Sequence, residues 1–166
     1  MRSNLMDEGT QQRSLNIETW HELGQEGNML PVTICLEGDS MRPLIRRGRD
    51  KVTILPVMRP LKKGDIVLFK GGSKRYVVHR LYRMRGNRVQ TLGDNCYYPD
   101  PWMPIEFVWG LVMKMERDGR TYVFDNRASR AFGRIWMFIH PVRILCRRCR
   151  NLAVRCIKKV LRMVKA

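Results

Sequence analysis

A serine that directly follows a strand-like run is the first candidate for chemistry in this sequence. Ser40 lies in the segment 37–45, after the run Val32–Leu36, and Pro43 prevents a regular continuation of that run. A serine held exposed at the end of a strand is suited to act as a nucleophile. The alternative interpretation is a turn in which Asp39 and Ser40 hydrogen-bond to nearby backbone amides.

His79 is the candidate base, because it is the only one of the three histidines inside a predicted strand. A serine hydroxyl becomes nucleophilic when a neighbour with a pKa near neutrality accepts its proton, and histidine commonly does this. Asp94 and Asp100 follow the next strand, and either carboxylate could orient the imidazole through its second nitrogen. The residues therefore predict a Ser/His/Asp site whose activity falls below about pH 6.5. The alternative is a histidine with a purely structural role.

The five cysteines predict neither a disulfide framework nor a metal centre. Their number is odd and the sequence shows no cleavable signal segment before them, so a reduced, cytoplasmic compartment is expected. Cys146 and Cys149 have the spacing of half a zinc site, with Cys156 further on, but no second pair or suitably placed histidine completes four ligands. Apolar packing or lipid modification explains these three cysteines better. We expect no metal and no organic cofactor.

Short runs separated by turn residues must position these side chains. Such runs at regular spacing are typical of a compact β domain, which we expect at residues 30–126, so the predicted fold class is mainly β. Residues 1–29 form an N-terminal extension with a short helix at 14–29, and residues 127–166 form a basic helical tail. The expected strands are Val32–Leu36, Lys51–Leu55, Asp65–Phe69, Arg75–Tyr82, Arg88–Leu92, Val108–Glu116 and Thr121–Phe124.

The tail carries most of the formal net charge of +17. Twelve of the 32 Lys and Arg residues follow Asp125, and no Asp or Glu does. Apolar residues recur every three or four positions from Arg143 onward, which places them on one face of a helix with the cationic residues opposite. This pattern is typical of a helix lying on an anionic membrane, and we expect residues 131–166 to bind one from the cytoplasmic side. Packing on the β domain is the main alternative, and nucleic-acid binding is the least favoured.

Six motifs in a fixed order resemble those of type I signal peptidases. They cover residues 31–116, about half of the chain, and follow one another as Gly38–Pro43, Gly48–Val52, Lys63–Phe69, Val78–Arg80, Thr91–Asn95 with Asp100, and Val108–Val112. These peptidases share a superfamily with the self-cleaving SOS-type repressors. The resemblance implies a signal-peptidase/LexA-like β domain with a serine peptidase site, which cuts a leader or signal segment from a peptide or preprotein.

The residue at the base position identifies the branch that the chain resembles. In the usual bacterial branch a lysine precedes the arginine of the fourth motif, and here His79 precedes Arg80. This is similar to the archaeal and endoplasmic-reticulum branch, in which serine works with histidine. In that branch the orienting aspartate lies six residues beyond the aspartate of the Gly-Asp-Asn motif. The resemblance therefore implies Asp100, with Asp94 framing the site and remaining the alternative.

The resemblance also implies which residues around the nucleophile contact substrate, namely Gly38, Asp39, Met41 and Pro43. Gly38 is a departure, because the family's side-chain oxyanion donor, when present, is a serine at this position. Backbone N–H groups, chiefly that of Ser40, would then stabilise the oxyanion. A second departure is that we expect no transmembrane anchor, since no run approaches the roughly 18 apolar residues of a membrane span.

Two hypotheses for function follow from these residues. The first is a serine endopeptidase with Ser40 as nucleophile and His79 as base, docked on the inner face of a membrane through its basic tail. The second is a non-catalytic β scaffold whose tail binds an anionic membrane or nucleic acid. A self-cleaving regulator fits less well, because the sequence shows no helix-turn-helix and its candidate base is not lysine.

Overall fold

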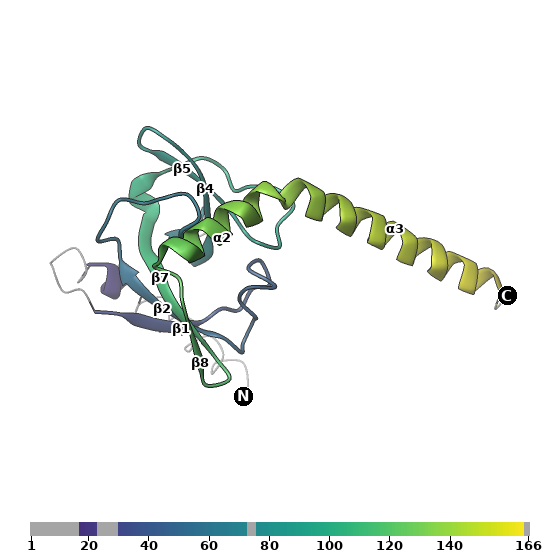
Figure 1. Cartoon of the computed structure of the whole chain (residues 1–166), viewed down its shortest axis with the longest axis horizontal. Coiled ribbons are helices and arrows are strands. Elements are labelled where there is room, and N and C mark those ends of the chain that lie inside the picture. Colours follow the sequence, from purple (N-terminus) through teal and green to yellow (C-terminus); the bar gives the residue numbers. More distant parts are fainter. Residues whose placement is uncertain (1–16, 23–29, 73–75, 165–166) are drawn as a thin grey trace, which may run out of the picture.

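The strands form a single curled antiparallel sheet, with two helices at its C-terminal end (Figure 1). The computed structural model describes residues 17–22, 30–72 and 76–164, with side chains of the last helix described as far as residue 157. Along the sheet the strand order is β1-β2-β7-β3-β4-β5-β6, and β8 pairs with β7. The strands are β1 (Val32–Cys35), β2 (Lys51–Pro56), β3 (Ile66–Lys70), β4 (Tyr76–Arg85), β5 (Arg88–Leu92), β6 (Met103–Pro104), β7 (Val108–Arg117) and β8 (Arg120–Val123).

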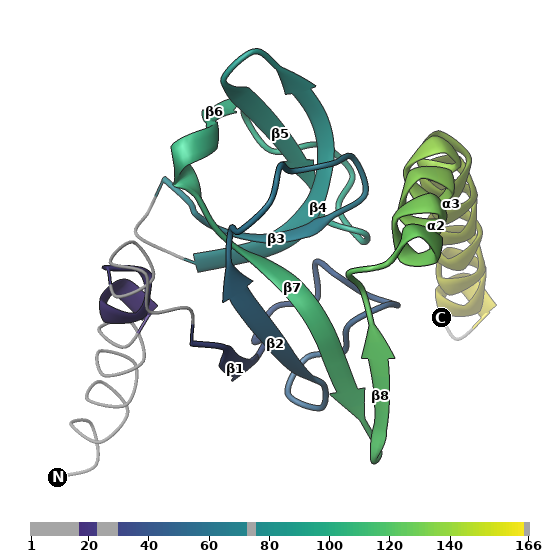
Figure 2. The ribbon, with the colours of Figure 1, turned by 60° about the vertical axis from the view of Figure 1, so that its left-hand side comes forward.

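Strand β7 connects the two halves of the sheet. Along one edge it pairs with β2, and along the other it pairs first with β3 and then with β8. The register shifts between Thr53 and Ile54 of β2 and between Leu68 and Phe69 of β3. Such irregularities bend a strand and increase its twist. The long β7 therefore carries the sheet around from the β1–β2–β8 half to the β3–β4–β5 half, as Figure 2 shows.

The core lies on both faces of this sheet. Ile66 and Leu68 of β3 belong to one buried apolar cluster, and Val67 and Phe69 belong to the other, because successive side chains of a strand point to opposite faces. Trp20, in the helical segment 17–22, packs into the first cluster. The other buried members of the first cluster are Met41, Ile45, Val52, Ile54, Val78, Val112 and Met115, and those of the second are Leu61, Leu81, Val89, Val108 and Leu111.

The predicted strands agree with the structure. All seven are present, with bounds that differ by at most three residues, so the mainly β class is confirmed. β6 was not predicted, because its two residues are too few to show an alternating pattern. Of the helix predicted at 14–29, residues 17–22 are helical and the rest lies outside the described residues.

Two helices, α2 (Arg127–Phe138) and α3 (His140–Val164), account for the predicted helical tail. Asn126 begins α2 by accepting a hydrogen bond from the Ser129 N–H at 2.6 Å. Gly133 lets α2 approach the sheet closely, since a Cβ atom there would lie 2.6 Å from Nη1 of Arg80. α3 continues away from the body of the domain (Figure 1). No helix in the described part of the chain is both long and apolar enough to cross a bilayer.

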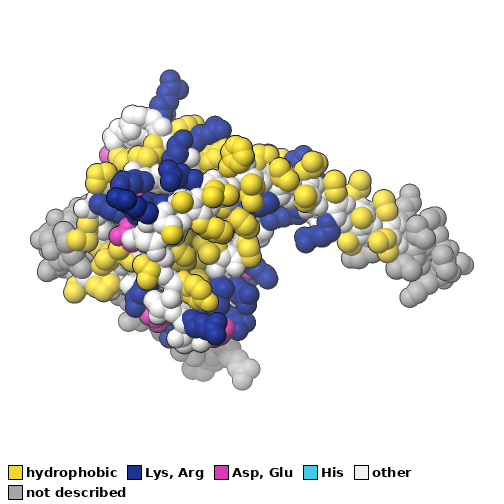
Figure 3. Space-filling view, in the orientation of Figure 1, with side chains coloured by type: hydrophobic (Ala, Val, Ile, Leu, Met, Phe, Trp, Pro, Cys, Tyr) yellow, Lys and Arg dark blue, Asp and Glu magenta, His cyan; other side chains and the backbone are white. Residues whose placement is uncertain are grey.

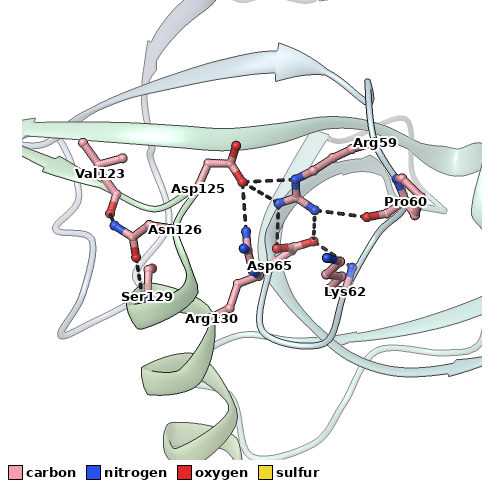
Figure 4. A network of polar contacts seen from close by, with 9 residues as sticks. All are labelled: Arg59, Pro60, Lys62, Asp65, Val123, Asp125, Asn126, Ser129 and Arg130. Atoms are coloured by element: carbon pink, nitrogen blue, oxygen red, sulfur yellow. Dashed lines mark hydrogen bonds and ion pairs between the residues drawn. The ribbon is translucent and has the colours of Figure 1, made fainter.

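A network of ion pairs fixes the point where the helices leave the sheet (Figure 4). Arg59, between β2 and β3, donates to Asp65 at 2.9 Å and to Asp125 at 2.8 Å. Arg130 of α2 donates to the same Asp125 oxygen at 3.0 Å. The hydrogen bond with Asp65, helped by that with Asp125, raises the pKa of Arg59 above its usual range. The network joins the β2–β3 loop to the first turns of α2.

Candidate active site

The imidazole of His79 is held by a carboxylate from the loop that follows β5. Its Nδ1 atom lies 2.7 Å from Oδ2 of Asp100. β4 places the histidine in the interior, where only 6% of the residue is exposed. The same carboxylate oxygen accepts a hydrogen bond from Oγ1 of Thr91 at 2.5 Å, and the Asp100 N–H donates to the Thr91 carbonyl at 2.8 Å. Thr91 thus fixes the carboxylate, and the ionised carboxylate favours the imidazole tautomer with hydrogen on Nδ1.

Ser40 reaches the same place from the loop after β1. Its carbonyl oxygen accepts a hydrogen bond from the Asn95 N–H at 2.7 Å, and Nδ2 of Asn95 donates to the Asp39 carbonyl at 3.1 Å. Gly93 marks the closest approach, since a Cβ atom there would lie 2.9 Å from Nε2 of His79 and 2.9 Å from the Ser40 carbonyl oxygen. Only a residue without a side chain lets the serine loop and the imidazole meet. The described Ser40 Oγ makes no hydrogen bond to His79 in this arrangement.

The surroundings of His79 make it a stronger base than an isolated imidazole. Burial lowers its pKa, but the hydrogen bonds to Asp100 and to Cys96 outweigh burial and raise the pKa to about 9. The sequence predicted activity down to about pH 6.5 because it used the pKa of an unperturbed histidine. In the structure the pKa of His79 is higher than that of a free histidine, because Asp100 and Cys96 lie against the ring.

Asp94 has a different partner, Arg80. The two side chains form a bidentate ion pair, with Nε–Oδ1 at 3.0 Å and Nη2–Oδ2 at 2.8 Å, and neither side chain is more than 2% exposed. Arg80 also donates to the Gly64 carbonyl at 3.0 Å. Of the two aspartates that the sequence offered as the orienting residue, the structure brings Asp100 to the histidine and keeps Asp94 on the arginine.

The four residues implied as substrate contacts lie in different environments. Gly38 and Asp39 are exposed beside Ser40, and the space at the Gly38 Cβ position is open apart from the serine hydroxyl 4.0 Å away. Met41 is fully buried in the first core cluster, so only its backbone could meet a substrate. Pro43 borders an apolar hollow of about 280 Å³, lined also by Leu44, Met115, Arg117, Tyr122, Phe124, Phe132 and Trp136.

One edge of α3 braces the loop that carries these groups, which the sequence did not reveal. Nε2 of His140 lies 2.9 Å from the Cys96 carbonyl oxygen, and Arg147 donates to the Asn95 carbonyl at 2.7 Å. Arg143 donates to the Asp94 carbonyl, and Asn151 to the hydroxyl of Tyr97 at 3.5 Å. The four helix residues recur every three or four positions, so they share one edge. This spacing could be seen in the sequence. It indicates a contact only once the loop after β5 is known to lie against α3.

Cys96 and Thr91 are the other site residues that sequence reasoning missed. Cys96 lies in the stretch between the two candidate aspartates, so its position along the chain was the one available signal. Thr91 begins the fifth motif of the resemblance, but the sequence assigned no role to its side chain. Both became visible only when the structure placed them against His79 and Asp100.

Comparison with protein-family models and with curated proteins gave no match to this chain. The arrangement of side chains is therefore the basis for any statement about function. The Ser40 loop, a buried histidine and a carboxylate converge here, and a Ser/His/Asp set can transfer an acyl group through a covalent intermediate.

Proposed function

We propose that this chain is a serine endopeptidase with a signal-peptidase/LexA-like fold, which cuts a leader or signal segment from a peptide or preprotein. The observation that carries the proposal is the meeting of the Ser40 loop with the His79–Asp100 pair across Gly93. The curled antiparallel sheet and the order of the six motifs also support it.

The mechanism follows from the positions of the three side chains. Ser40 Oγ rotates toward Nε2 of His79, which takes the hydroxyl proton while Oγ attacks the scissile carbonyl carbon. Asp100 keeps hydrogen on Nδ1 and stabilises the imidazolium that forms. The backbone N–H of Ser40 stabilises the oxyanion, and the open space beside Gly38 admits the substrate carbonyl. The imidazolium then protonates the leaving amine, and water hydrolyses the acyl-enzyme.

The test is labelling of the purified full chain with a fluorophosphonate probe, which phosphonylates activated serines with loss of fluoride. We expect one label, on Ser40, and no label in Ser40→Ala or His79→Ala. Ser129→Ala is the matched control, because Ser129 is a half-buried residue in the first turn of α2 and should not affect labelling. A folded wild-type chain that takes no label, or a label that persists without His79, would overturn the proposal in favour of a non-catalytic scaffold.

The rate of labelling at Ser40 should depend on pH through His79. The base must be neutral to accept the serine proton, and with a pKa of about 9 only about 1% of His79 is neutral at pH 7. We therefore expect the rate to rise roughly tenfold per pH unit from about pH 7 and to level off near pH 9. The measurement is the second-order rate constant of labelling across this range. A plateau already reached at about pH 7 would contradict the raised pKa.

The same chain offers a surface for an anionic membrane, and we propose that it docks there. Apolar residues follow one another at steps of three, four or seven positions over α2 and α3, and each is at least half exposed: Phe132, Ile135, Phe138, Val142, Leu145 and Leu152. We call these residues the apolar stripe. Figure 3 shows hydrophobic side chains running over α2 and along α3. At 100° per residue, the α3 part of the stripe lies opposite the edge that braces the site loop. Val142 and Leu145 therefore point away from the β domain, whereas Phe132 and Leu152 border hollows that also contain residues of that domain. Packing on the domain does not account for the exposed part of the stripe.

The charges beside the apolar stripe favour a bilayer with anionic headgroups as its partner. α2 and α3 contain no Asp or Glu, and at 100° per residue Arg148 and Arg155 of α3 lie beside the stripe. Basic side chains near such a surface each contribute on the order of 1 kcal/mol of attraction, and buried apolar side chains anchor the helix. A helix with one cationic and one apolar side fits this interface better than it fits a uniformly charged nucleic acid.

Binding of the full chain to vesicles of phosphatidylcholine with and without phosphatidylglycerol tests this surface. We expect binding only with the anionic lipid, weakened at least about tenfold by Leu145→Gln combined with Leu152→Gln, since each leucine loses apolar contact. Leu30→Gln is the control, because Leu30 is as exposed but lies before β1. If the double variant binds the anionic vesicles as tightly as the wild-type chain, or if the chain binds RNA as tightly as it binds these vesicles, membrane docking is contradicted.

A further inference from the structure

Cys96 occupies the position beside His79 where the nucleophile of this site must arrive. Its thiol lies beside the imidazole of His79, close enough to help raise the pKa of that ring. A Cβ atom at Gly93 would lie 2.6 Å from Sγ of Cys96 and 2.9 Å from Nε2 of His79, so sulfur and nitrogen converge on the same point. The Ser40 carbonyl oxygen lies 2.9 Å from that point as well. The imidazole held by Asp100 thus lies beside the thiol of Cys96 and the backbone of the Ser40 loop.

The other cysteines lack this environment. Cys35 is exposed on the edge strand β1, and Cys146, Cys149 and Cys156 are exposed on α3. Among the described residues, none of these four hydrogen-bonds to a histidine. Cys96 is partly exposed, so a small molecule can reach it. A reactive cysteine is recognised by this combination of partial access and a neighbouring basic group.

We propose that Cys96 is a modification site, at which a peroxide or another small electrophile reacts with a thiol activated by His79. Its bond to the imidazole is the counterpart of the Ser/His relation, with sulfur as the nucleophile. The backbone carbonyl of Cys96 faces His140 of α3, at 2.9 Å from Nε2, which holds the residue in this place. The modification site is therefore built from β4, the loop after β5 and α3.

The chemistry with hydrogen peroxide balances within this set of groups. The Cys96 thiol gives its proton to Nε2 of His79, and the resulting thiolate, beside the imidazolium, attacks one peroxide oxygen, so an S–O bond forms and the O–O bond breaks. The departing hydroxide takes the proton back from the imidazolium and leaves as water. The sulfur is oxidised to sulfenic acid and the peroxide is reduced. A thiol reductant reverses the reaction by way of a mixed disulfide.

The consequence for Ser40 rests on the proposed peptidase function. An oxygen added to Sγ lies in the space where Nε2 and the Ser40 loop converge at Gly93. It accepts or donates a hydrogen bond at Nε2, so the imidazole is no longer available to the serine hydroxyl. Oxidation of Cys96 therefore closes the peptidase site, and reduction reopens it.

The first experiment needs no peptidase activity. The full chain is treated with iodoacetamide at pH 7, and alkylation of Cys96 and Cys35 is followed by mass spectrometry in the same sample. We expect Cys96 to react at least about tenfold faster than Cys35. His79→Gln and, separately, Asp100→Asn should each bring Cys96 down to the rate of Cys35, whereas Ser40→Ala should leave it unchanged. Equal rates for the two cysteines in the wild-type chain would overturn the proposal.

The second experiment measures the effect on Ser40. Peroxide should abolish fluorophosphonate labelling of the wild-type chain, and dithiothreitol should restore it. Cys96→Ser should resist peroxide, and Cys35→Ser, the matched control, should stay sensitive. Cys96→Ala should also move the pH midpoint of labelling downward, because one of the hydrogen bonds that raise the pKa of His79 is lost. If Ser40 takes no probe under any condition, the peptidase proposal is wrong. The alkylation rates of Cys96 and Cys35 then still test the modification site.

Discussion

Asp100→Asn should lower the rate of fluorophosphonate labelling at Ser40 by about 10⁴-fold without unfolding the protein. The asparagine amide can take the place of Oδ2 and donate to Nδ1 of His79, which forces the ring hydrogen onto Nε2. An Nε2 atom that already carries hydrogen cannot accept the serine proton. The loss should occur even though removing the Asp100 charge lowers the pKa of His79 and leaves more of it neutral. On this proposal the imidazole of His79 must be neutral and must also carry its hydrogen on Nδ1.

The control for this change is Asp118→Asn, in the exposed turn between β7 and β8. Asparagine tolerates the positive φ of 49° at that position, so neither stability nor labelling should change. Folding of Asp100→Asn is checked by urea unfolding followed by tryptophan fluorescence. If Asp100→Asn labels within about tenfold of the wild-type rate, Asp100 does not orient the base. The hydrogen bond between His79 and Asp100 would then have a structural role only.

The sequence could predict the pair that matters most, because its members follow from strand positions. His79 lies in an alternating run that had to be a strand, and the strand order brought the loop after β5 alongside it. The choice between Asp94 and Asp100 came only from a family resemblance, since both follow the same strand. The structure separates them by what each carboxylate meets, a buried guanidinium for Asp94 and an imidazole for Asp100.

The pKa of His79 and the bracing of its loop could not be read from the sequence. Both depend on contacts between segments far apart in the chain, namely the thiol of Cys96 and the polar edge of α3. The direction of the Met41 side chain could not be read from the sequence either. The resemblance implied a substrate contact for this neighbour of Ser40, but the turn directs its side chain into the core, where it is fully buried. Proximity along the chain does not tell which way a turn points a side chain.

Asp94→Ala should destabilise the fold by about 3–5 kcal/mol. The change leaves the guanidinium of Arg80, which is 1% exposed, with only the Gly64 carbonyl as a described hydrogen-bond partner. Arg143 lies close enough to interact electrostatically with both Asp94 and Arg80, so its charge also loses the compensating carboxylate. The loss should lower the midpoint of thermal unfolding by on the order of 10 °C. Glu116→Ala is the control, because the Lys114–Glu116 pair is open to solvent and should contribute little to stability.

The double change Arg80→Met with Asp94→Leu separates a structural role of Asp94 from a catalytic one. An apolar pair of similar volume leaves no buried charge behind, so the double variant should be more stable than Asp94→Ala alone. At low temperature, where both variants are folded, Ser40 should still take the fluorophosphonate label, because the His79–Asp100 pair is intact. An Asp94→Ala chain with wild-type stability and no labelling would instead make Asp94 the residue that orients the base.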